Sequence, residues 1–365
     1  MSQVIFNSDD HAHMAHALRL AERGLFTTQP NPRVGAVVVR DGVVVGAGFH
    51  ARAGEAHAEV FALRQAGFAA RGATVYVTLE PCAHSGRTPP CVDALLAAGV
   101  ARVIAAVKDP YPRVAGAGFA RLKAAGIEVG VGLLEGPARA LNEGFLLRFE
   151  RGWGLTRLKL ATSLDGRTAL ASGESKWITG LPARADVQRL RARSSAIVTG
   201  SETIIADDPR LTVRLDEPFR APLKVILDRQ LRIPASARVF DDHAGVLIYN
   251  HTGKARPDLS ARGANLIEVS PSDSVNQLKE VLIDLSHRGC NEILIESGPT
   301  LAGAFLSAGL IDELVLYLAP KLLGHSARPL ANLALDLLSQ APEFKLLECR
   351  AFGDDLRLTY RPLHE

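Results

Sequence analysis

The sequence predicts an α/β protein of two domains, and three observations lead to that prediction. The chain has 365 residues, and at about 150 residues per domain this length suggests two hydrophobic cores. Apolar residues make up 47% of the chain and charged residues 22%, as in folded globular proteins. Strand and helix patterns alternate through both halves, and a new series begins near residue 150. We therefore expect one domain over residues 1–150 and a second over residues 151–365.

The first half is predicted to form three layers. Two strands, 34–39 and 43–48, are joined by the hairpin signal Asp41-Gly42. The other predicted strands are 74–79, 103–107 and 127–131, and the predicted helices are 14–21, 57–66, 91–98, 119–125 and 141–149. Strands that alternate with helices pair in parallel, so helices are expected on both faces of the sheet.

The second half shows another alternating series. Its predicted strands are 156–161, 196–199, 223–227, 293–295 and 313–318, and its predicted helices are 183–193, 275–285 and 301–308. The segments 216–220 and 241–262 are polar and contain Pro or Gly, so we expect them to be surface loops.

Charge and hydropathy exclude several classes of function. The net charge of +3 comes from scattered basic residues, so the footprint of a nucleic-acid binder is missing. No apolar run approaches the ~20 residues that span a bilayer, so no membrane partner is expected. Asp9 and Asp10 lie where a signal peptide has positive charge and an apolar run, which favours the cytoplasm. Four cysteines are too few for a disulfide scaffold, so a close pair indicates metal binding or catalysis.

Four residues of the first half match the pattern of zinc-dependent deaminases. His57 and Glu59 open a predicted helix, and Cys82 follows a predicted strand. In such enzymes one His and two Cys hold zinc, while a glutamate that is not a ligand moves protons. The second cysteine, Cys91, comes after eight residues instead of the usual two. Because a tetrahedral site constrains atoms in space and not spacing along the chain, the set His57, Cys82 and Cys91 is retained.

Two other interpretations of these residues remain open. The cysteines could be small core residues, with His57 an ordinary surface histidine. Alternatively, His84 could complete a closed structural zinc site. Glu59 argues against the closed site, because such a site has no use for a carboxylate beside the metal.

Further motifs give the chain a family resemblance over nearly its whole length. In the first half they are His57-Ala58-Glu59, Thr78-Leu79-Glu80-Pro81-Cys82 and Gly86-Arg87-Thr88-Pro89-Pro90-Cys91. In the second half they are Lys159-Leu160-Ala161, Ser163-Leu164-Asp165-Gly166-Arg167, Ser172-Gly173-Glu174-Ser175, Trp177-Ile178-Thr179, Ala206-Asp207-Asp208-Pro209 and Glu296-Ser297-Gly298-Pro299-Thr300-Leu301. The chain thus resembles the bifunctional deaminase/reductases of riboflavin biosynthesis.

The resemblance implies a cytidine-deaminase-like domain followed by a dihydrofolate-reductase-like domain. It also implies one Zn²⁺ per chain, NADPH as the second cofactor and a small phosphorylated pyrimidine riboside as substrate. The first reaction is deamination of 2,5-diamino-6-ribosylamino-4(3H)-pyrimidinone 5′-phosphate. The second reduces the ribosyl group and gives 5-amino-6-(5-phospho-D-ribitylamino)uracil. We expect the enzyme to act as a homo-oligomer.

Binding residues follow from the same resemblance. Glu59 is the catalytic residue of the deaminase, and Asn31 and His50 contact the pyrimidine; the alternative for these two is a rigid turn and an exposed strand-end histidine. Cofactor positions are Ala161, Trp177, Thr203, Asp207, Arg229 and the stretch Gly298, Pro299, Thr300, Leu301, Ala302, Gly303 and Ala304. Substrate positions in the reductase are Ser175, Arg191, Leu211, Arg214 and Glu296. Lys108-Asp109-Pro110 either lines the deaminase site or is a plain loop.

The reductase half lacks the G-x-G-x-x-G fingerprint of dinucleotide-binding folds, so it needs another way to hold phosphates. The segment Glu296 to Thr300 leaves a strand and opens a helix, whose free N–H groups suit a pyrophosphate. Ser297 or Thr300 as a simple helix cap is the alternative. Asp228 and Arg229 end a strand, and we expect Arg229 to bind the 2′-phosphate while Asp228 turns away to cap the following loop.

Two other functions remain possible at this stage. One is a nucleoside or nucleic-acid base deaminase fused to an unrelated α/β domain, although only 5% of the residues are aromatic. The other is a zinc-stabilised interaction protein without activity. Ammonia release from free pyrimidine nucleosides would favour the first, and zinc binding without turnover the second.

Overall fold

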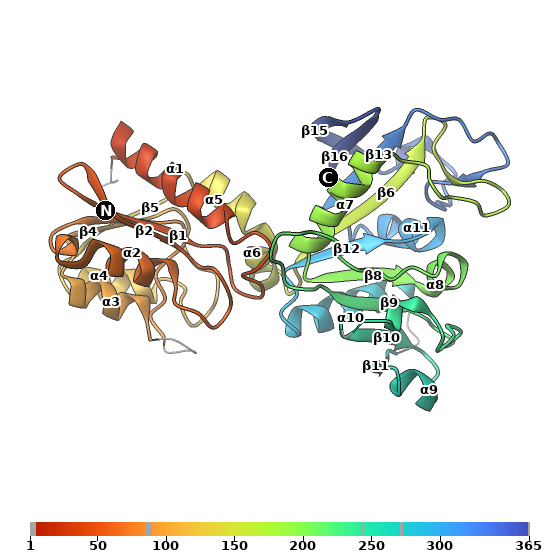
Figure 1. The fold of residues 1–365 in the computed structure, drawn as a ribbon, viewed down its shortest axis with the longest axis horizontal. Helices are drawn as coiled ribbons and strands as arrows, with labels where there is room; N and C mark the ends of the chain where they lie inside the picture. The colour runs from red at the N-terminus through yellow and green to blue at the C-terminus, as the bar shows by residue number, and fades with distance from the viewer. Residues whose placement is uncertain (1–4, 85–88, 243, 271–272, 364–365) are drawn as a thin grey trace. The chain divides into compact units, whose positions relative to one another are not determined.

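A computed structural model describes residues 5–84, 89–242, 244–270 and 273–363 (Figure 1). The chain divides into two compact units, Met1–Gly152 and Trp153–Glu365. Gly86, Arg87 and Thr88, which belong to one of the family motifs, lie outside the described residues.

Unit 1 is built on a five-stranded sheet with the order β2-β1-β3-β4-β5. Its strands are β1 (Gly35–Arg40), β2 (Val43–Phe49), β3 (Thr74–Val77), β4 (Arg102–Ala105) and β5 (Glu128–Val131). β1 pairs antiparallel with both β2 and β3, whereas β3, β4 and β5 run parallel. The predicted hairpin and the predicted parallel strands are both confirmed.

Helices cover both faces of this sheet. One face carries α1 (Ser8–Glu22), α5 (Glu135–Leu141) and α6 (Glu143–Glu150), and the other carries α2 (Ala58–Ala66), the turn η1 (Gly67–Ala70), α3 (Cys91–Ala98) and α4 (Ala117–Ala124). In β1, Val37 and Val39 face the first set while Ala36 and Val38 face the second, as the twofold alternation of a strand requires. The three-layer prediction is confirmed.

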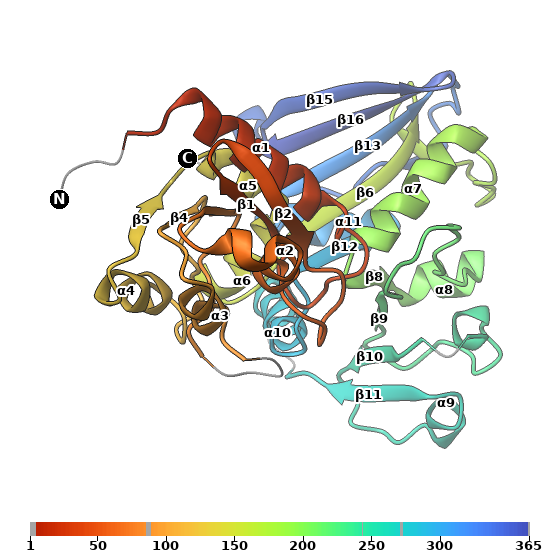
Figure 2. The same cartoon turned by 60° about the vertical axis from the view of Figure 1, so that its left-hand side comes forward.

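Unit 2 contains a nine-stranded sheet with the order β11-β10-β9-β8-β12-β6-β13-β16-β15 (Figure 2). Its strands are β6 (Leu155–Ser163), β8 (Ala196–Gly200), β9 (Leu223–Leu227), β10 (Val246–Asn250), β11 (Ala264–Glu268), β12 (Glu292–Glu296), β13 (Glu313–Ala319), β15 (Phe344–Phe352) and β16 (Asp355–Pro362). The strands from β11 to β13 are parallel, and β16 and β15 extend the sheet as an antiparallel hairpin. β7 (Arg167–Ala169) pairs separately with β14 (Arg328–Pro329).

The second sheet is also covered on both faces. α10 (Ser274–His287) and α11 (Pro299–Ser307) pack on one face, and α7 (Leu181–Arg193), α8 (Ser201–Asp207) and α9 (Pro257–Ser260) pack on the other. The short turns η2 (Arg238–Phe240) and η3 (Leu338–Gln340) lie in connecting segments. The unit is therefore a mainly parallel α/β domain, as predicted.

One loop prediction is wrong. Residues 241–262 were expected to be a surface loop, yet they contain α9 and the strand β10, every residue of which is buried. β10 lies between β9 and β11, so the run Val246–Asn250 has sheet neighbours on both sides. The polar residues flanking this short apolar run hid it in the sequence. Segment 216–220 has no helix or strand, as expected.

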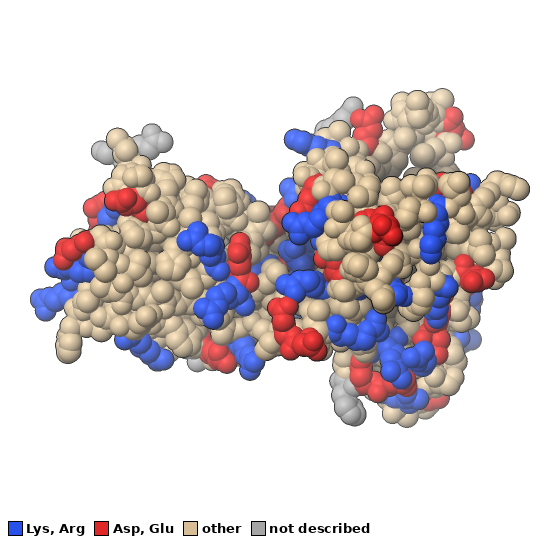
Figure 3. Space-filling model, turned by 45° about the horizontal axis from the view of Figure 1, so that its top comes forward, with Lys and Arg blue, Asp and Glu red and all other residues tan. Residues whose placement is uncertain are grey.

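No helix among the residues that the structure describes combines the length and the apolar character needed to cross a membrane. On the face drawn in Figure 3, basic and acidic side chains are interspersed. This mixture agrees with the scattered charge pattern of the sequence.

Candidate active sites

Three predicted zinc ligands come together in unit 1. His57 is the N-cap of α2, Cys91 is the first residue of α3, and Cys82 lies in the segment after β3. The His57 Nδ1 atom lies 3.1 Å from Cys91 Sγ and 3.5 Å from Cys82 Sγ. Ligand atoms of a tetrahedral zinc site are about 3.6 Å apart, so this nitrogen and these two sulfurs fit zinc. Among the described residues this is the only such group of three or more potential ligands.

Local backbone structure explains how His57 and Glu59 face one site. His57 still has an extended backbone, while Glu59 already belongs to the first turn of α2. The His57 side chain makes no capping hydrogen bond, and its Nδ1 atom faces the two cysteines instead. The Cys91 backbone N–H donates to Cys82 Sγ at 3.3 Å, and a helix N-terminus favours the thiolate form of such a ligand.

Glu59 is buried beside Cys91, and burial raises the pKa of its carboxyl. A buried carboxyl beside the predicted metal ligands is suited to carry protons between a water molecule and a substrate. His84 does not belong to the ligand cluster. Its ring packs against that of Tyr111, with the centroids 5.6 Å apart. The arrangement is that of three protein ligands with a fourth position left for water, as in catalytic zinc sites.

Asn31 and His50 meet beside the zinc ligands. The Asn31 amide nitrogen lies 3.0 Å from His50 Nε2, and the ring of His50 is 5.3 Å from that of His57. His50 is buried, and its Nδ1 contacts the carbonyl oxygen of Ala56 at 3.1 Å. The exposed strand-end histidine considered above is therefore wrong for His50.

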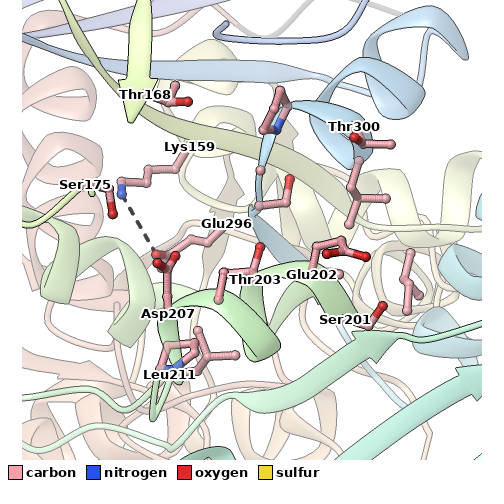
Figure 4. Close-up of a pocket in the computed structure, with 18 of the residues that line it drawn as sticks. Lys159, Thr168, Ser175, Ser201, Glu202, Thr203, Asp207, Leu211, Glu296 and Thr300 are labelled. Atoms are coloured by element: carbon pink, nitrogen blue, oxygen red, sulfur yellow. Dashed lines mark ion pairs between the residues drawn. The ribbon is translucent and has the colours of Figure 1, made fainter. Parts of the chain in front are cut away.

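Unit 2 contains a cavity of about 1660 Å³. It opens at the carboxyl ends of the parallel strands, where Gly200, Leu227 and Glu296 end β8, β9 and β12. Open α/β sheets bind ligands at this edge. In Figure 4, Lys159 and Glu296 face each other in the cavity, and Thr203 and Asp207 are presented by α8.

Most of the residues predicted for the reductase line this cavity. They are Ala161, Ser175, Trp177, Arg191, Thr203, Asp207, Leu211, Arg214, Arg229, Glu296, Gly298, Pro299, Thr300, Leu301 and Ala304. Ala302 and Gly303 do not line it. Ala302 is fully buried in the core, and a Cβ on Gly303 would lie 2.0 Å from the Asn332 carbonyl oxygen. The helical periodicity of α11 turns Ala302 and Gly303 inward, which explains why neither lines the cavity.

The start of α11 fits a phosphate group. Gly298 is its N-cap and makes no side-chain capping bond, and a Cβ at this position would meet no atom within 4 Å. The neighbouring Ser297 hydroxyl is buried without a hydrogen-bond partner among the described residues. Free backbone N–H groups, open space and an unpaired hydroxyl suit the pyrophosphate of a dinucleotide. Neither Ser297 nor Thr300 caps α11 with its side chain, because the N-cap is Gly298.

The floor of the cavity carries a charged cluster. Arg191 binds the Glu296 carboxylate with two nitrogens, at 2.6 and 2.9 Å, and Lys159 Nζ lies 3.9 Å from the same carboxylate. Burial alone would raise the pKa of Glu296, but Arg191 and Lys159 hold it at about 2. Burial lowers the pKa of Lys159, against the opposing effect of Glu296. Arg191 therefore belongs to the floor of the cavity and not to a solvated charged face of α7.

Asp228 and Arg229 separate as predicted at the end of β9. The Asp228 carboxylate is fully buried and accepts the backbone N–H of Ile233 at 2.9 Å. Arg229 lines the cavity, and its guanidinium has no ion-pair or hydrogen-bond partner within the described part of the chain. An unpaired guanidinium is available to an anionic ligand.

Comparison with known proteins matches each unit to a family. Residues 7–107 match the cytidine and deoxycytidylate deaminase zinc-binding region, and residues 156–358 match the RibD C-terminal domain. Riboflavin biosynthesis protein RibD of Escherichia coli is 51% identical over 362 residues, which cover 96% of this chain and 98% of the relative. The chain belongs to the RibD family.

Solved RibD structures share the fold of the whole chain. Acinetobacter baumannii RibD superposes with a TM-score of 0.92 at 48% identity, over 98% of this chain and 99% of that one. A deaminase/reductase from Thermotoga maritima gives 0.86 at 34% identity, over 97% and 99%. The RibD-family chain is therefore a bifunctional enzyme of riboflavin biosynthesis with deaminase and reductase activities. These matches favour this function over both alternatives, the base deaminase with an unrelated second domain and the interaction protein.

The residue at this RibD site that sequence reasoning left out is Lys159. It appeared in a family motif but was given no role. The available signal was a single lysine within the apolar strand β6, at a position whose side chain is largely buried. A buried lysine requires a partner, and Glu296 supplies it.

Proposed function

We propose that the chain performs two consecutive steps on one phosphorylated pyrimidine riboside. Unit 1 deaminates 2,5-diamino-6-ribosylamino-4(3H)-pyrimidinone 5′-phosphate, and unit 2 reduces the ribosyl group with NADPH. The product is 5-amino-6-(5-phospho-D-ribitylamino)uracil. The observation that carries the proposal is that one chain holds both a zinc-ligand cluster beside buried Glu59 and a separate cavity with the Arg191–Glu296 pair.

In the deaminase, His57, Cys82 and Cys91 hold the metal. Zinc, when bound, supplies activation of a water molecule for attack on an electron-poor ring carbon. Glu59 would accept one proton from that water and deliver it to the ring nitrogen, and would then carry the proton of the added hydroxyl group to the amine, which leaves as ammonia. Its burial beside Cys91 keeps this carboxyl out of bulk water, so its proton passes to the substrate and not to solvent.

Asn31 and His50 orient the pyrimidine. The amide of Asn31 and the imidazole of His50 are already hydrogen-bonded to each other beside the zinc ligands. Both ring nitrogens of His50 already have partners, so His50 positions the Asn31 amide, and Asn31 keeps its amide oxygen and its second N–H for the pyrimidine. Substitution of either residue is expected to raise KM for the diaminopyrimidine.

In the reductase, NADPH occupies the part of the cavity between α8 and the start of α11. When bound, it supplies the hydride for the anomeric carbon of the ribosylamino group. The N-terminal N–H groups of α11 and the Ser297 hydroxyl hold the pyrophosphate. Arg229 holds the 2′-phosphate through a charge-assisted contact. Ala161, Trp177, Thr203 and Asp207 line the remainder of this site.

The riboside phosphate occupies the other part of the cavity. Arg214 lines it, and its guanidinium makes no hydrogen bond or ion pair to any residue described, so it is free to hold the 5′-phosphate. Ser175 and Leu211 border this region. Lys159, Arg191 and Glu296 present donors and an acceptor to the pyrimidine and the opening ribose.

We further propose a homo-oligomer in the cytoplasm. β15 is an edge strand of the nine-stranded sheet and leaves Leu346 and Leu347 about half exposed. An exposed edge of this kind is suited to pairing with a second copy, which sedimentation of the purified chain tests. All four cysteines are free, and thiols that bind zinc need a reducing compartment.

The decisive experiment supplies the diaminopyrimidine riboside phosphate with and without NADPH. Ammonia release without NADPH is expected, and NADPH oxidation is expected only after deamination has occurred. Free pyrimidine nucleosides serve as the control and should release no ammonia. Oxidation of NADPH without prior ammonia release would contradict the proposed order of the two steps.

A further inference from the structure

Glu80 lies two residues before the zinc ligand Cys82, and its carboxylate is buried. Backbone N–H groups surround it. Oε1 accepts from Gly116 at 3.0 Å, from Gly118 at 3.0 Å and from Phe119 at 3.3 Å. Oε2 accepts from Gly116 at 3.0 Å and from Asp109 at 3.3 Å. One side chain thus holds both ends of the segment from residue 109 to residue 119.

The same segment is pressed against the backbone beside Glu80. A Cβ on Gly118 would lie 2.1 Å from the Pro81 carbonyl oxygen, a distance at which atoms overlap. Gly118 has helical backbone and belongs to α4, so its lack of a side chain, and not a special φ, permits this approach. The contact and the five hydrogen bonds fix residues 109–119 relative to the chain that leads into Cys82.

This segment borders the zinc site. It follows β4, which is next to β3 in the sheet, so its residues leave the same sheet edge as Cys82. The Tyr111 ring packs on His84, two residues beyond Cys82. The Asp109 carboxylate accepts the Tyr111 backbone N–H at 2.8 Å. Residues 109–119, called the wall below, therefore border the place where a substrate reaches the metal.

We propose that Glu80 is a positioning residue of the deaminase that fixes this wall and so determines affinity for the pyrimidine riboside. It contacts neither the metal cluster nor the reacting atoms. Oε1 holds the start of α4 by accepting three backbone N–H groups. Oε2 holds the part of the loop nearest β4 by accepting the Asp109 N–H. The inference rests on the proposed deaminase function.

Glu80→Gln tests the proposal with little change in side-chain volume. A glutamine oxygen can keep the three donors of Oε1, but its amide nitrogen cannot accept the two N–H groups that Oε2 binds. Gly116 N–H still has Oε1, so Asp109 N–H is the donor that loses its bond to this side chain. Loss of one hydrogen bond to a charged group is expected to raise KM for the diaminopyrimidine about tenfold or more. The rate at saturating substrate, the zinc content and the reductase activity should remain close to those of the wild type.

Asp10→Asn is the matched control in the same unit. Asp10 is also a buried carboxylate, and it accepts from Tyr76, Arg102 and the Asn7 backbone. It belongs to the opposite layer of the sheet. This variant is expected to lower the thermal unfolding midpoint without changing KM.

Each outcome of these measurements supports or overturns the proposal. Unchanged KM in Glu80→Gln, or loss of zinc from it, would overturn the positioning role. If that variant does not fold, Gly118→Ala displaces the same wall from the other side, and a wild-type KM in it would equally overturn the proposal. Failure of the wild-type enzyme to deaminate the substrate would instead count against the proposed function itself.

Discussion

The two units organise their chemistry differently. In unit 1 the chemistry is confined to a few atoms. His57 Nδ1 lies 3.1 Å from Cys91 Sγ and 3.5 Å from Cys82 Sγ, and the buried carboxylate of Glu59 lies beside them. Unit 2 distributes it over a cavity of about 1660 Å³, in which charges such as Arg191 and Glu296 already neutralise each other. A concentrated site depends entirely on a few atoms, whereas a distributed site tolerates the loss of one contact. Single substitutions should therefore have larger effects on deamination than on reduction.

Removal of one zinc ligand is expected to have the largest effect. Cys91→Ser should lose the one zinc per chain and all measurable deamination, because a serine hydroxyl is a poor ligand at neutral pH. Metal analysis and ammonia release measure both quantities. Cys349→Ser, a change at an exposed cysteine of unit 2, is the control. Undiminished zinc in Cys91→Ser would remove this residue from the ligand set.

Glu59→Gln should come next. The amide keeps the shape of the side chain but cannot accept the proton, so deamination should fall by about 10²- to 10⁴-fold or more while zinc stays bound. The variant should still reduce the already deaminated riboside, because the reductase residues belong to another compact unit. Loss of both activities in a folded variant would contradict the independence of the two sites.

Arg229→Ala tests the distributed site. We expect a clear preference for NADPH, and loss of one charged phosphate contact should weaken NADPH binding by about 1.5–3 kcal/mol, roughly ten- to a hundredfold. Use of NADH should change little. Steady-state titration of both cofactors measures this. Equal use of both by the wild type would refute the preference, and unchanged NADPH affinity would exclude Arg229 from the site.

The last effect leaves the chemistry aside and concerns the pH dependence of stability. Because the folded-state pKa of Glu296 is about 2 and its ordinary value is 4.5, its contribution is present above pH 4.5 and is lost as the pH falls toward 2. The difference corresponds to at most about 3 kcal/mol. Glu296→Gln should therefore unfold at a lower temperature than the wild type at neutral pH, and the gap should narrow on acidification.

Glu202→Gln is the control for this measurement. Glu202 is an exposed glutamate paired with Arg232, so its replacement should leave the unfolding midpoint unchanged. A gap between Glu296→Gln and the wild type that stayed constant from neutral to acid pH would contradict the linkage.

The sequence predicted correctly those parts of the molecule in which residue type and the local helix or strand pattern indicate the same structure. The zinc ligands lie at helix starts and after a strand, so residue type and position together predicted them. β10 was missed because its five residues lie between polar segments. The hairpin β15–β16 was not assigned, since β15 is exposed along much of its length and lacks a clear buried face.

Contacts between distant segments account for the rest of the site. Lys159 and Glu296 are adjacent through the pairing of β6 with β12, in which they are direct neighbours. Asn31 meets His50 because the loop before β1 folds over the end of β2. Glu80 accepts N–H groups from backbone that follows it by 29 to 39 residues. Hydrogen bonds to backbone leave no trace in residue type, so no motif could indicate them.

The size of the reductase cavity has a consequence for inhibitor design. Pockets for one drug-sized ligand usually enclose about 300–1000 Å³, and this cavity encloses about 1660 Å³ as one continuous space. Arg229 and Arg214 both line it, and their guanidinium groups are free for ligand anions. A single molecule that joins a nicotinamide mimic to a ribityl phosphate could engage both regions at once. Its second half would bind at the high effective concentration set by the linker, which multiplies affinity without any new protein contact.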